Sequence, residues 1–385
     1  MWEVNCEGQT KTHKLEEFLF YHGFLLAGEA QELLEKEEEW LVRAEKWKTG
    51  GRSIIISILW RNNVYHTRVR CFQDKGWKGP DETYFSSVAE LLCQVQTKRL
   101  FVTSDGARLG APVLRPVWKI RSDRVKLEKQ LAKGQFGVVW FGYLQVQVHW
   151  LPVAVKTRHS TATDTDIDDM IEEAKVQCYY LHPNVVKFIG LAADREPVMI
   201  ILQYCAGGSM RDRLRRDKNK VSTVLRLRWC TDLSKGMEYL ATEHCLIHRD
   251  LAARNCLIGA DQSCKIADFG LSGKLRQDPK LPIKWMAPES FTEQHLGVPL
   301  FTTQTDVWSF GILLWEIFHN GKEPWSSLTS KQAMKHIMAG SRLKIYSSVP
   351  GEVRRLTEWC WSDYPENRPS FTQIRKTLET IARIK

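Results

Sequence analysis

The chain has 385 residues, of which 43% are hydrophobic, and its 55 basic and 45 acidic residues give a formal net charge of +10. This length and apolar content suffice for two domains, one of about 100 residues and one larger, each with its own core. No apolar run approaches the roughly 20 residues that a membrane-spanning helix needs, and the N-terminus lacks the pattern of a secretion signal. We therefore expect a cytoplasmic protein.

The cysteines and the positive charge exclude several kinds of site. Ten cysteines show no C-x-x-C pair and no other metal-ligand spacing, so we expect reduced thiols, no disulfides and no zinc. The net charge is compatible with nucleic acid, an anionic membrane or simple solubility. Because no nucleic-acid-binding motif accompanies it, we expect no nucleic-acid partner and keep peripheral association with the inner plasma membrane as a secondary alternative.

Three motifs in chain order mark the first domain: Tyr21-His22-Gly23, Trp40-Leu41-Val42-Arg43 and Ser87-Val88-Ala89-Glu90-Leu91-Leu92. In this order they resemble an SH2 domain, an antiparallel sheet flanked by two helices. We place it at residues 18–98, after an N-terminal extension of residues 1–17. The resemblance implies that Arg43 binds the phosphate of phosphotyrosine through its planar guanidinium group. Taken alone, such an arginine would more simply extend from a strand end into solvent.

Two further positions complete the predicted phosphotyrosine pocket. An arginine that SH2 domains often carry four residues after the Tyr-His-Gly glycine is Ala27 here. His66 matches the pocket histidine of the family, and Arg68 shares its face because side chains alternate along a strand. We expect Arg68 to replace part of the missing contact. The basic residues of the loop after Arg43 are more simply solvated: Lys46, Lys48 and Arg52.

The two domains are joined by residues 99–117. Glycine and proline interrupt this stretch without a sustained period, which predicts a linker with one short strand. We expect packing of the second domain, residues 118–385, to begin at Trp118.

The second domain begins with three informative segments. Residues 132–139 read Ala-Lys-Gly-Gln-Phe-Gly-Val-Val and predict a β-hairpin. Further on, Val153-Ala154-Val155-Lys156 predicts a strand with Ala154 and Lys156 on one face. A helix expected over residues 168–180 carries Glu173. Taken singly, such a lysine and such a glutamate are most simply solvated charges.

The run His248-Arg249-Asp250-Leu251-Ala252-Ala253-Arg254-Asn255 is followed by Asp268-Phe269-Gly270. Transfer of a γ-phosphoryl group requires an acceptor for the hydroxyl proton, two cation ligands and positive charge beside the moving phosphate. An isolated Asp-Phe-Gly is most simply a turn, but the two motifs at this spacing together indicate phosphotransfer. The residues that supply these roles are Asp250, then Asn255 with Asp268, and Arg254.

These motifs in this order resemble the protein kinases, which implies a bilobal domain with a β-rich N-lobe and an α-rich C-lobe. The overall fold class is then α+β. The resemblance pairs Lys156 with Glu173 and makes Asn255 and Asp268 the ligands of Mg²⁺. It also implies an ATP site, with adenine between Val139, Ala154 and Leu257. The full ATP set is Leu131, Ala132, Lys133, Gly134, Gln135, Phe136, Gly137, Val139, Ala154, Lys156, Gln203, Cys205 and Leu257.

Three departures from the kinase pattern affect what we expect. Ala132 occupies the first glycine position of the nucleotide loop, which favours a stiffer loop and weaker nucleotide binding. Gln177 lies one helical turn after Glu173, where relatives have an apolar residue, and a buried amide without partners costs roughly 1–3 kcal/mol. Residues 271–287 contain no tyrosine or threonine, so Arg249 would lack a phosphorylated partner. We expect this segment to be ordered without phosphorylation, or the SH2 domain to set the active arrangement.

The expected acceptor is tyrosine. Serine/threonine kinases usually carry a lysine where this chain has Ala252, whereas Arg254 resembles the tyrosine-kinase arrangement, with the loop over residues 282–289 supporting the acceptor ring. Asp306 fits a structural anchor of the family, and Arg368 is the expected buried partner of Glu289.

The order of the two domains most resembles the Fes/Fer cytoplasmic tyrosine kinases, without their N-terminal membrane-binding and coiled-coil region. The resemblance implies a monomeric non-receptor protein tyrosine kinase that uses ATP and Mg²⁺, acts on protein tyrosines and is recruited to tyrosine-phosphorylated proteins. The alternative is a phosphotyrosine-binding adaptor with a weakly active or inactive kinase-like domain.

Overall fold

The computed structural model describes residues 14–46, 52–134, 137–158, 164–272, 281–291 and 300–384. The predicted ATP-loop residues Gln135 and Phe136 lie outside these ranges, as does Lys48, and the side chains of Lys46 and Arg52 are not described. The chain divides into two compact units: Met1–Leu151, Val155–Asp169 and Gly190–Ile201 form one, and Pro152–Ala154, Met170–Ile189 and Leu202–Lys385 form the other.

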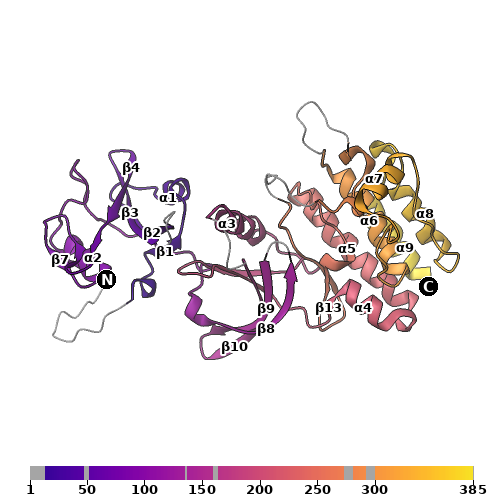
Figure 1. The fold of residues 1–385 in the computed structure, drawn as a ribbon, viewed down its shortest axis with the longest axis horizontal. Helices are drawn as coiled ribbons and strands as arrows, with labels where there is room; N and C mark the ends of the chain where they lie inside the picture. Colours follow the sequence, from indigo (N-terminus) through magenta and orange to yellow (C-terminus); the bar gives the residue numbers. More distant parts are fainter. Residues whose placement is uncertain are drawn as a thin grey trace. The chain divides into compact units, whose positions relative to one another are not determined.

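The first unit begins with a four-stranded sheet in the order β1-β2-β3-β4 (Figure 1). β2, β3 and β4 pair antiparallel, as predicted, whereas β1 joins β2 in parallel. Helices α1 and α2 lie on opposite sides of this sheet in Figure 1. The elements are β1 Tyr21–Phe24, α1 Ala27–Leu33, β2 Trp40–Lys46, β3 Arg52–Trp60, β4 Asn63–Val69 and α2 Val88–Thr97, with a small sheet of β5 Cys71–Phe72, β6 Gly76–Lys78 and β7 Tyr84–Phe85.

Helix α2 shows why this sequence folds locally as predicted. Its buried residues Val88, Leu91, Leu92 and Val95 follow the i, i+3, i+4, i+7 spacing of one helical face. The helix begins where Ser87 accepts a hydrogen bond from the Glu90 backbone N–H at 3.1 Å, which satisfies one of the unpaired amides of the first turn.

The segment over residues 99–117 packs on the first sheet. Trp40 Nε1 donates to the Gly110 carbonyl at 3.0 Å, and the backbone N–H of Val113 donates to the Trp40 carbonyl at 2.7 Å. The short strand predicted here reduces to isolated bridges, Phe101 with Arg108 and Trp40 with Pro112. The glycines and prolines that indicated a linker thus also prevent a longer strand from forming.

A second sheet follows, with five strands in the order β11-β12-β10-β9-β8. Its strands are β8 Val125–Gly134, β9 Gly137–Val146, β10 His149–Thr157, β11 Phe188–Ala192 and β12 Met199–Gln203. Helix α3, Asp164–Cys178, begins four residues before the predicted start and ends two before the predicted end. It ends there because His182 precedes Pro183, a position that disfavours helix, and the Tyr180 N–H closes a tight turn on the Gln177 carbonyl at 3.1 Å.

The second unit is mainly helical. Its elements include β13 Gly208–Ser209, α4 Met210–Asp217, α5 Thr223–Glu243, β14 Cys256–Ile258, β15 Cys264–Ile266, α6 Thr303–Phe318, α7 Ser330–Met338, α8 Gly351–Cys360 and α9 Phe371–Ile384. Short 3₁₀ turns of this unit are Lys218–Lys220, Ala253–Asn255, Ile283–Trp285, Pro288–Phe291 and Pro365–Asn367, and those of the first unit are Leu15–Glu17 and Ser122–Arg124. Every residue of α6 from Thr305 to Ile317 is buried, which marks α6 as the central helix of this unit.

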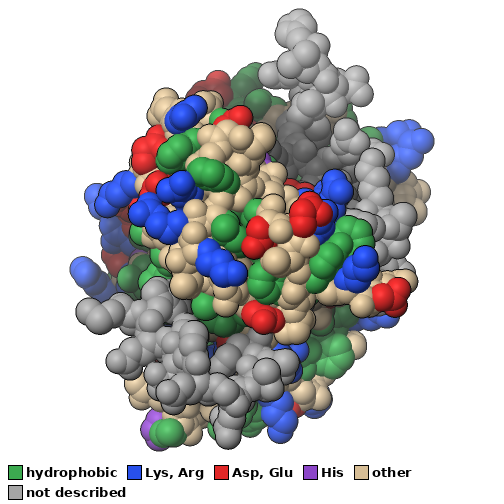
Figure 2. Space-filling model, turned by 90° about the vertical axis from the view of Figure 1, so that its left-hand side faces the viewer, with side chains coloured by type: hydrophobic (Ala, Val, Ile, Leu, Met, Phe, Trp, Pro, Cys, Tyr) green, Lys and Arg blue, Asp and Glu red, His purple; other side chains and the backbone are tan. Residues whose placement is uncertain are grey.

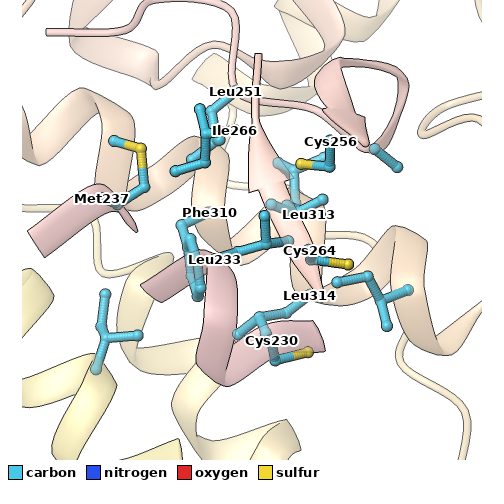
Figure 3. Packing of buried hydrophobic residues seen from close by; sticks show 14 of the residues in the cluster. Cys230, Leu233, Met237, Leu251, Cys256, Cys264, Ile266, Phe310, Leu313 and Leu314 are labelled. Atoms are coloured by element: carbon cyan, nitrogen blue, oxygen red, sulfur yellow. The ribbon is translucent and has the colours of Figure 1, made fainter. Parts of the chain in front are cut away.

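Both ends of the predicted catalytic segment are anchored in the hydrophobic core of this unit. Side chains from α5, α6, β14 and β15 meet in one cluster (Figure 3). Leu251 and Cys256, which flank residues 252–255, are fully buried in it. Burial raises the pKa of the Cys256 thiol, so the thiol stays uncharged in the core.

The positive charge is distributed rather than concentrated on the face shown in Figure 2. Lys and Arg side chains are interspersed there with acidic and apolar ones. Among the described residues of this face, such mixing gives no support to a basic stripe of the kind that nucleic acid requires. None of the helices in the described ranges is both long and apolar enough to cross a membrane.

Candidate phosphotransfer and phosphotyrosine sites

The backbone of the predicted catalytic loop, residues 248–255, is held by a buried carboxylate of α6. The N–H groups of His248 and Arg249 donate to Asp306 Oδ2 at 2.6 Å and Oδ1 at 3.0 Å. Burial raises the pKa of Asp306 to about 7, and the two backbone donors oppose the shift. Arg249 has a φ of 66°, a left-handed backbone conformation that is uncommon for residues other than glycine. The predicted anchor role of Asp306 is confirmed.

His248 links this loop to the strand before Asp268. Its Nε2 lies 3.2 Å from the Ala267 carbonyl, and its Nδ1 lies 3.3 Å from the backbone N of Asp250. Since a carbonyl only accepts and an N–H only donates, the proton sits on Nε2. Burial lowers the pKa of His248 to about 4, which keeps the ring neutral.

Both carboxylate oxygens of Asp250 contact side chains of the same loop. Oδ2 accepts from Asn255 Nδ2 at 2.7 Å, and Oδ1 forms an ion pair with Arg254. Burial raises the pKa of Asp250 to about 6, Arg254 opposes the shift, and the charge of Asp268 adds to it. The structure thus brings together the predicted residues Asp250, Arg254 and Asn255, with Asp268 close enough to act on them electrostatically.

A shelf of aromatic and basic side chains lies next to Asp250. The guanidinium of Arg254 lies 4.3 Å from the ring centroid of Trp285. Glu316 Oε2 accepts from both the backbone N of Ala253, at 2.9 Å, and Trp285 Nε1, at 3.0 Å. Burial raises the pKa of Glu316 to about 7. The sequence interpretation missed Glu316, although a single acid inside the apolar run of α6 was a detectable signal.

The donor set near Asp250 fits a hard divalent cation. Asn255 uses its amide nitrogen on Asp250, so its amide oxygen is the atom suited to a cation. Asp268 follows Ala267, whose backbone N donates to the Asn255 carbonyl at 2.9 Å, and this contact keeps the two residues together. Amide and carboxylate oxygens are the ligands that Mg²⁺ prefers.

Part of the predicted adenine site lies in a small apolar cluster of the second unit. Cys205 packs there with Val186 and Ala267, and Leu202 and Leu257 lie against them. Burial raises the pKa of Cys205 to about 11, so its thiol is uncharged. Gln203, at the end of β12, donates its backbone N–H to the Lys187 carbonyl at 2.9 Å.

The hairpin of β8 and β9 carries the other predicted nucleotide residues. Ala132 pairs with Val139 directly after a register shift between Gln130 and Ala132, and Lys133 and Gly134 follow in the same strand. The strand thus continues through the position of the missing glycine. Gly137 has a φ of +144°, and an added Cβ would lie 2.0 Å from the Thr157 carbonyl oxygen. Glycine is therefore required at position 137 by close packing. Leu131, also in β8, is exposed.

The predicted pairing of Lys156 with Glu173 stays a prediction. Lys156 lies on β10 in the first unit and Glu173 on α3 in the second. Ala154, on the same face of β10 as Lys156, is buried. Gln177 is buried on α3 as expected, but its amide has a partner, because Nε2 donates to the Val186 carbonyl at 3.5 Å. The expectation of an unpartnered amide is wrong, and the cost of burying it is correspondingly smaller.

The predicted partnership of Arg368 with Glu289 is confirmed. Arg368 Nη1 and Nη2 lie 2.6 Å and 2.9 Å from the two carboxylate oxygens of Glu289. This bidentate pair joins the loop after Trp285 to the segment before α9.

Arg249 has partners within the protein. Its Nη1 donates to the Leu271 carbonyl at 3.2 Å, and its guanidinium lies 5.3 Å from the ring centroid of Phe301. Ser272, the single hydroxyl residue of residues 271–287, donates to the His248 carbonyl at 3.3 Å.

The predicted phosphotyrosine residues share one face of the first sheet. Arg43 lies opposite Ile55, which lies opposite Arg68, and Ser57 lies opposite His66. Directly paired residues point to the same side of an antiparallel sheet, so Arg43, His66 and Arg68 face one way. Ala27, at the position of the absent arginine, is the first residue of α1.

The guanidinium of Arg43 is buried and held in place. Nε donates to Ser57 Oγ at 2.9 Å, Nη1 donates to the Leu25 carbonyl at 3.0 Å, and Nη1 also lies 2.5 Å from Glu45 Oε1. His66 Nδ1 lies 2.9 Å from the same Ser57 hydroxyl. Burial and the charge of Arg43 lower the pKa of His66, so the ring is neutral near pH 7. The sequence interpretation missed Ser57 and Glu45, although Glu45 stands two positions after Arg43 on the same strand.

Comparison with known proteins identifies the same two domains. Residues 125–378 match the protein tyrosine and serine/threonine kinase family, and residues 20–94 match the SH2 domain. The tyrosine-protein kinase Fer of Mus musculus is 35% identical over 382 residues, which cover 96% of this chain and 44% of Fer. Fer-related kinase 1 of Caenorhabditis elegans is 34% identical over 373 residues, 93% of this chain and 92% of that protein. The transforming protein Fps of Fujinami sarcoma virus is 32% identical over 373 residues, 94% of this chain and 41% of Fps. The chain thus spans less than half the length of Fer and Fps.

Proposed function

Because the chain belongs to the protein tyrosine and serine/threonine kinase family and carries an SH2 domain, we propose that it is a non-receptor protein tyrosine kinase. It transfers the γ-phosphoryl group of ATP to a tyrosine hydroxyl of a protein substrate, in the cytoplasm. The observation that carries this proposal is that Arg254 forms an ion pair with one carboxylate oxygen of Asp250 and Asn255 donates a hydrogen bond to the other.

Each residue around Asp250 has a role in this reaction. The tyrosine oxygen forms a bond to the γ-phosphorus, the bond from that phosphorus to ADP breaks, and the phenolic proton passes to Asp250. Arg254 orients Asp250 and adds positive charge near the moving group. Asn255 and Asp268 would hold Mg²⁺, which supplies charge that offsets the phosphates when it is bound.

The aromatic shelf favours tyrosine as the acceptor. Arg254 stacks on Trp285 beside Asp250, and Glu316 fixes both the indole and the backbone at Ala253. A flat, supported surface at this place suits a phenol ring, whose hydroxyl lies further from its own backbone than that of serine.

The SH2 domain also contacts kinase residues within the first unit, which supports a regulatory role. Phe24 N donates to the Ala193 carbonyl at 2.7 Å, Tyr21 Oη donates to the Asp194 carbonyl at 3.1 Å, and Lys119 Nζ donates to the His22 carbonyl at 3.1 Å. We infer that docking of the SH2 domain on phosphotyrosine is coupled through these contacts to the kinase.

The test is incorporation of labelled phosphate into a poly-Glu-Tyr substrate by the full chain and by Asp250→Asn. We expect the variant to lose about 10²-fold or more of the rate, because it lacks the proton acceptor. Equal incorporation by the two proteins would favour the adaptor function, in which only the SH2 domain acts.

A further inference from the structure

The arginine that should receive phosphate in the SH2 pocket already holds an anion of its own chain. Arg43 Nη1 lies 2.5 Å from Glu45 Oε1, and the exposed fractions of the two side chains are 1% and 38%. The two residues are separated by one position on β2, so they lie on the same face of the sheet. The carboxylate is therefore the solvent-exposed partner of a buried guanidinium.

Other contacts fix the orientation of the guanidinium of Arg43. Its Nε is engaged by Ser57 Oγ and its Nη1 by the Leu25 carbonyl, and Ser57 is in turn held by His66. A phosphate that reaches Arg43 thus meets it in the orientation that now suits Glu45. Ser57 Oγ contacts both the Arg43 Nε and the His66 ring, and Glu45 contacts Arg43, so the three groups form one cluster. Burial and the charge of Arg43 lower the pKa of His66, and the charge of Glu45 opposes the shift.

The charge balance of this face shows the consequence. Of the side chains that the structure describes here, Arg43 and Arg68 are cations, Glu45 is an anion and His66 is neutral near pH 7. Phosphotyrosine brings a charge of about −1.5 to −2. Glu45 cancels one of the two arginine charges that would otherwise balance the charge of the phosphate.

We propose that Glu45 is an internal competitor for the phosphate of phosphotyrosine at Arg43. A phosphorylated tyrosine binds only by displacing the Glu45 carboxylate into solvent, so the pocket binds more weakly than its arginines alone would allow. This inference rests on the proposed docking function of the SH2 domain. It implies that recruitment depends on peptide contacts outside the pocket or on a high density of phosphotyrosine.

The test measures binding of full-chain variants to a fluorescein-labelled random peptide library in which every peptide contains one phosphotyrosine. Fluorescence anisotropy reports the binding, and unlabelled phenyl phosphate serves as the competitor. Glu45→Gln keeps the size of the side chain and removes the charge, and Glu45→Ala removes the group. Glu35→Gln makes the same change of net charge at an exposed position away from Arg43. Arg43→Ala reports binding outside the pocket, and thermal unfolding checks that each variant is folded.

We expect Glu45→Gln and Glu45→Ala to bind about tenfold or more tightly than the parent, because one charge-assisted bond no longer has to be broken. Glu35→Gln should bind like the parent. Equal binding by parent and Glu45 variants, lost in Arg43→Ala, would overturn the competition and leave docking intact. Weaker binding by the Glu45 variants would also overturn it and make Glu45 a positioning residue for Arg43. No binding by any folded variant would overturn both this inference and the docking function.

Discussion

At the scale of single residues, Arg249 contacts protein groups at the place where a phosphorylated loop residue would otherwise contact it. It donates to the Leu271 carbonyl and lies over the ring of Phe301. Ser272, the single hydroxyl residue of residues 271–287, donates to the His248 carbonyl. We expect these two contacts to hold Arg249 in place without a phosphorylated side chain.

Phosphatase treatment is therefore expected to leave kinase activity within about twofold of the untreated value, since the Leu271 carbonyl and the Phe301 ring already contact Arg249. Activity towards poly-Glu-Tyr, with mass spectrometry of residues 271–287 before and after treatment, measures this. A Ser272→Ala variant serves as the control. Loss of activity together with a phosphosite mapped inside this segment would contradict the prediction.

Arg68 belongs to the same scale. It is exposed and faces the same side of the sheet as Arg43, where we expect it to replace part of the contact absent at Ala27. Arg68→Ala should weaken phosphopeptide binding by roughly 1 kcal/mol, less than a buried charge-assisted bond because solvent screens it. Isothermal calorimetry, with the exposed Lys98→Ala as a control for lost positive charge, measures the effect. Unchanged affinity in Arg68→Ala would assign the phosphate to Arg43 and His66 alone.

At the scale of elements, α6 organises the catalytic loop from within the core. Asp306 near its start accepts hydrogen bonds from the backbone N–H groups of His248 and Arg249. Glu316 near its end accepts from the backbone N–H of Ala253 and from the indole N–H of Trp285. The two carboxylates lie in the same buried helix and hold the two ends of the loop. The helix thus fixes the backbone on both sides of Asp250, and Arg254 and Asn255 of the loop hold its carboxylate.

Burial raises the pKa of Glu316 from 4.5 to about 7, so its contribution to stability is present below pH 4.5 and is lost as the pH rises through 7. Glu316→Gln retains an oxygen acceptor and does not titrate. The stability of the parent relative to Glu316→Gln should therefore fall between pH 5 and 8, by at most about 3 kcal/mol. Urea midpoints at both pH values measure this, with the exposed Glu358→Gln as control. A difference that stays constant across this range would contradict the assigned shift.

At the scale of the whole molecule, the SH2 domain and the kinase strands of the first unit meet at a glycine. Gly23 has a φ of +70°, and a Cβ there would lie 2.1 Å from the Ala193 carbonyl oxygen. The Phe24 N–H donates to that same carbonyl. The close approach of the two backbones thus requires a residue without a side chain.

Gly23→Ala should lower the urea midpoint of the first unit, by about 2 kcal/mol or more in free energy, because the backbones must separate and alanine is strained at positive φ. It should also reduce kinase activity if these contacts couple the two domains. Gly28→Ala is the matched control, since an added Cβ there meets no atom within 4 Å and α1 gains a better helix former. Equal midpoints and activities in the two variants would contradict this packing.

The chemistry of the protein was predictable from its sequence because the groups involved are close together in the chain. Asp250, Arg254 and Asn255 lie within one short loop, and the spacing to Asp268 completes the set. Arg43, His66 and Arg68 were predictable for a related reason, since alternation along paired strands determines the face that each residue occupies.

Only the tertiary structure decided which distant groups hold these residues in place. Glu316 lies 63 positions from Ala253, and no local pattern indicates that its carboxylate reaches that amide. The partner of Gln177 and the required glycine at position 23 likewise depend on backbone from other segments. The ion pair of Arg43 with Glu45 is local in sequence, yet burial of the arginine beneath the sheet face decided that the two side chains meet. Long-range packing determines such contacts because burial forces each polar group to find whichever partner the fold brings near.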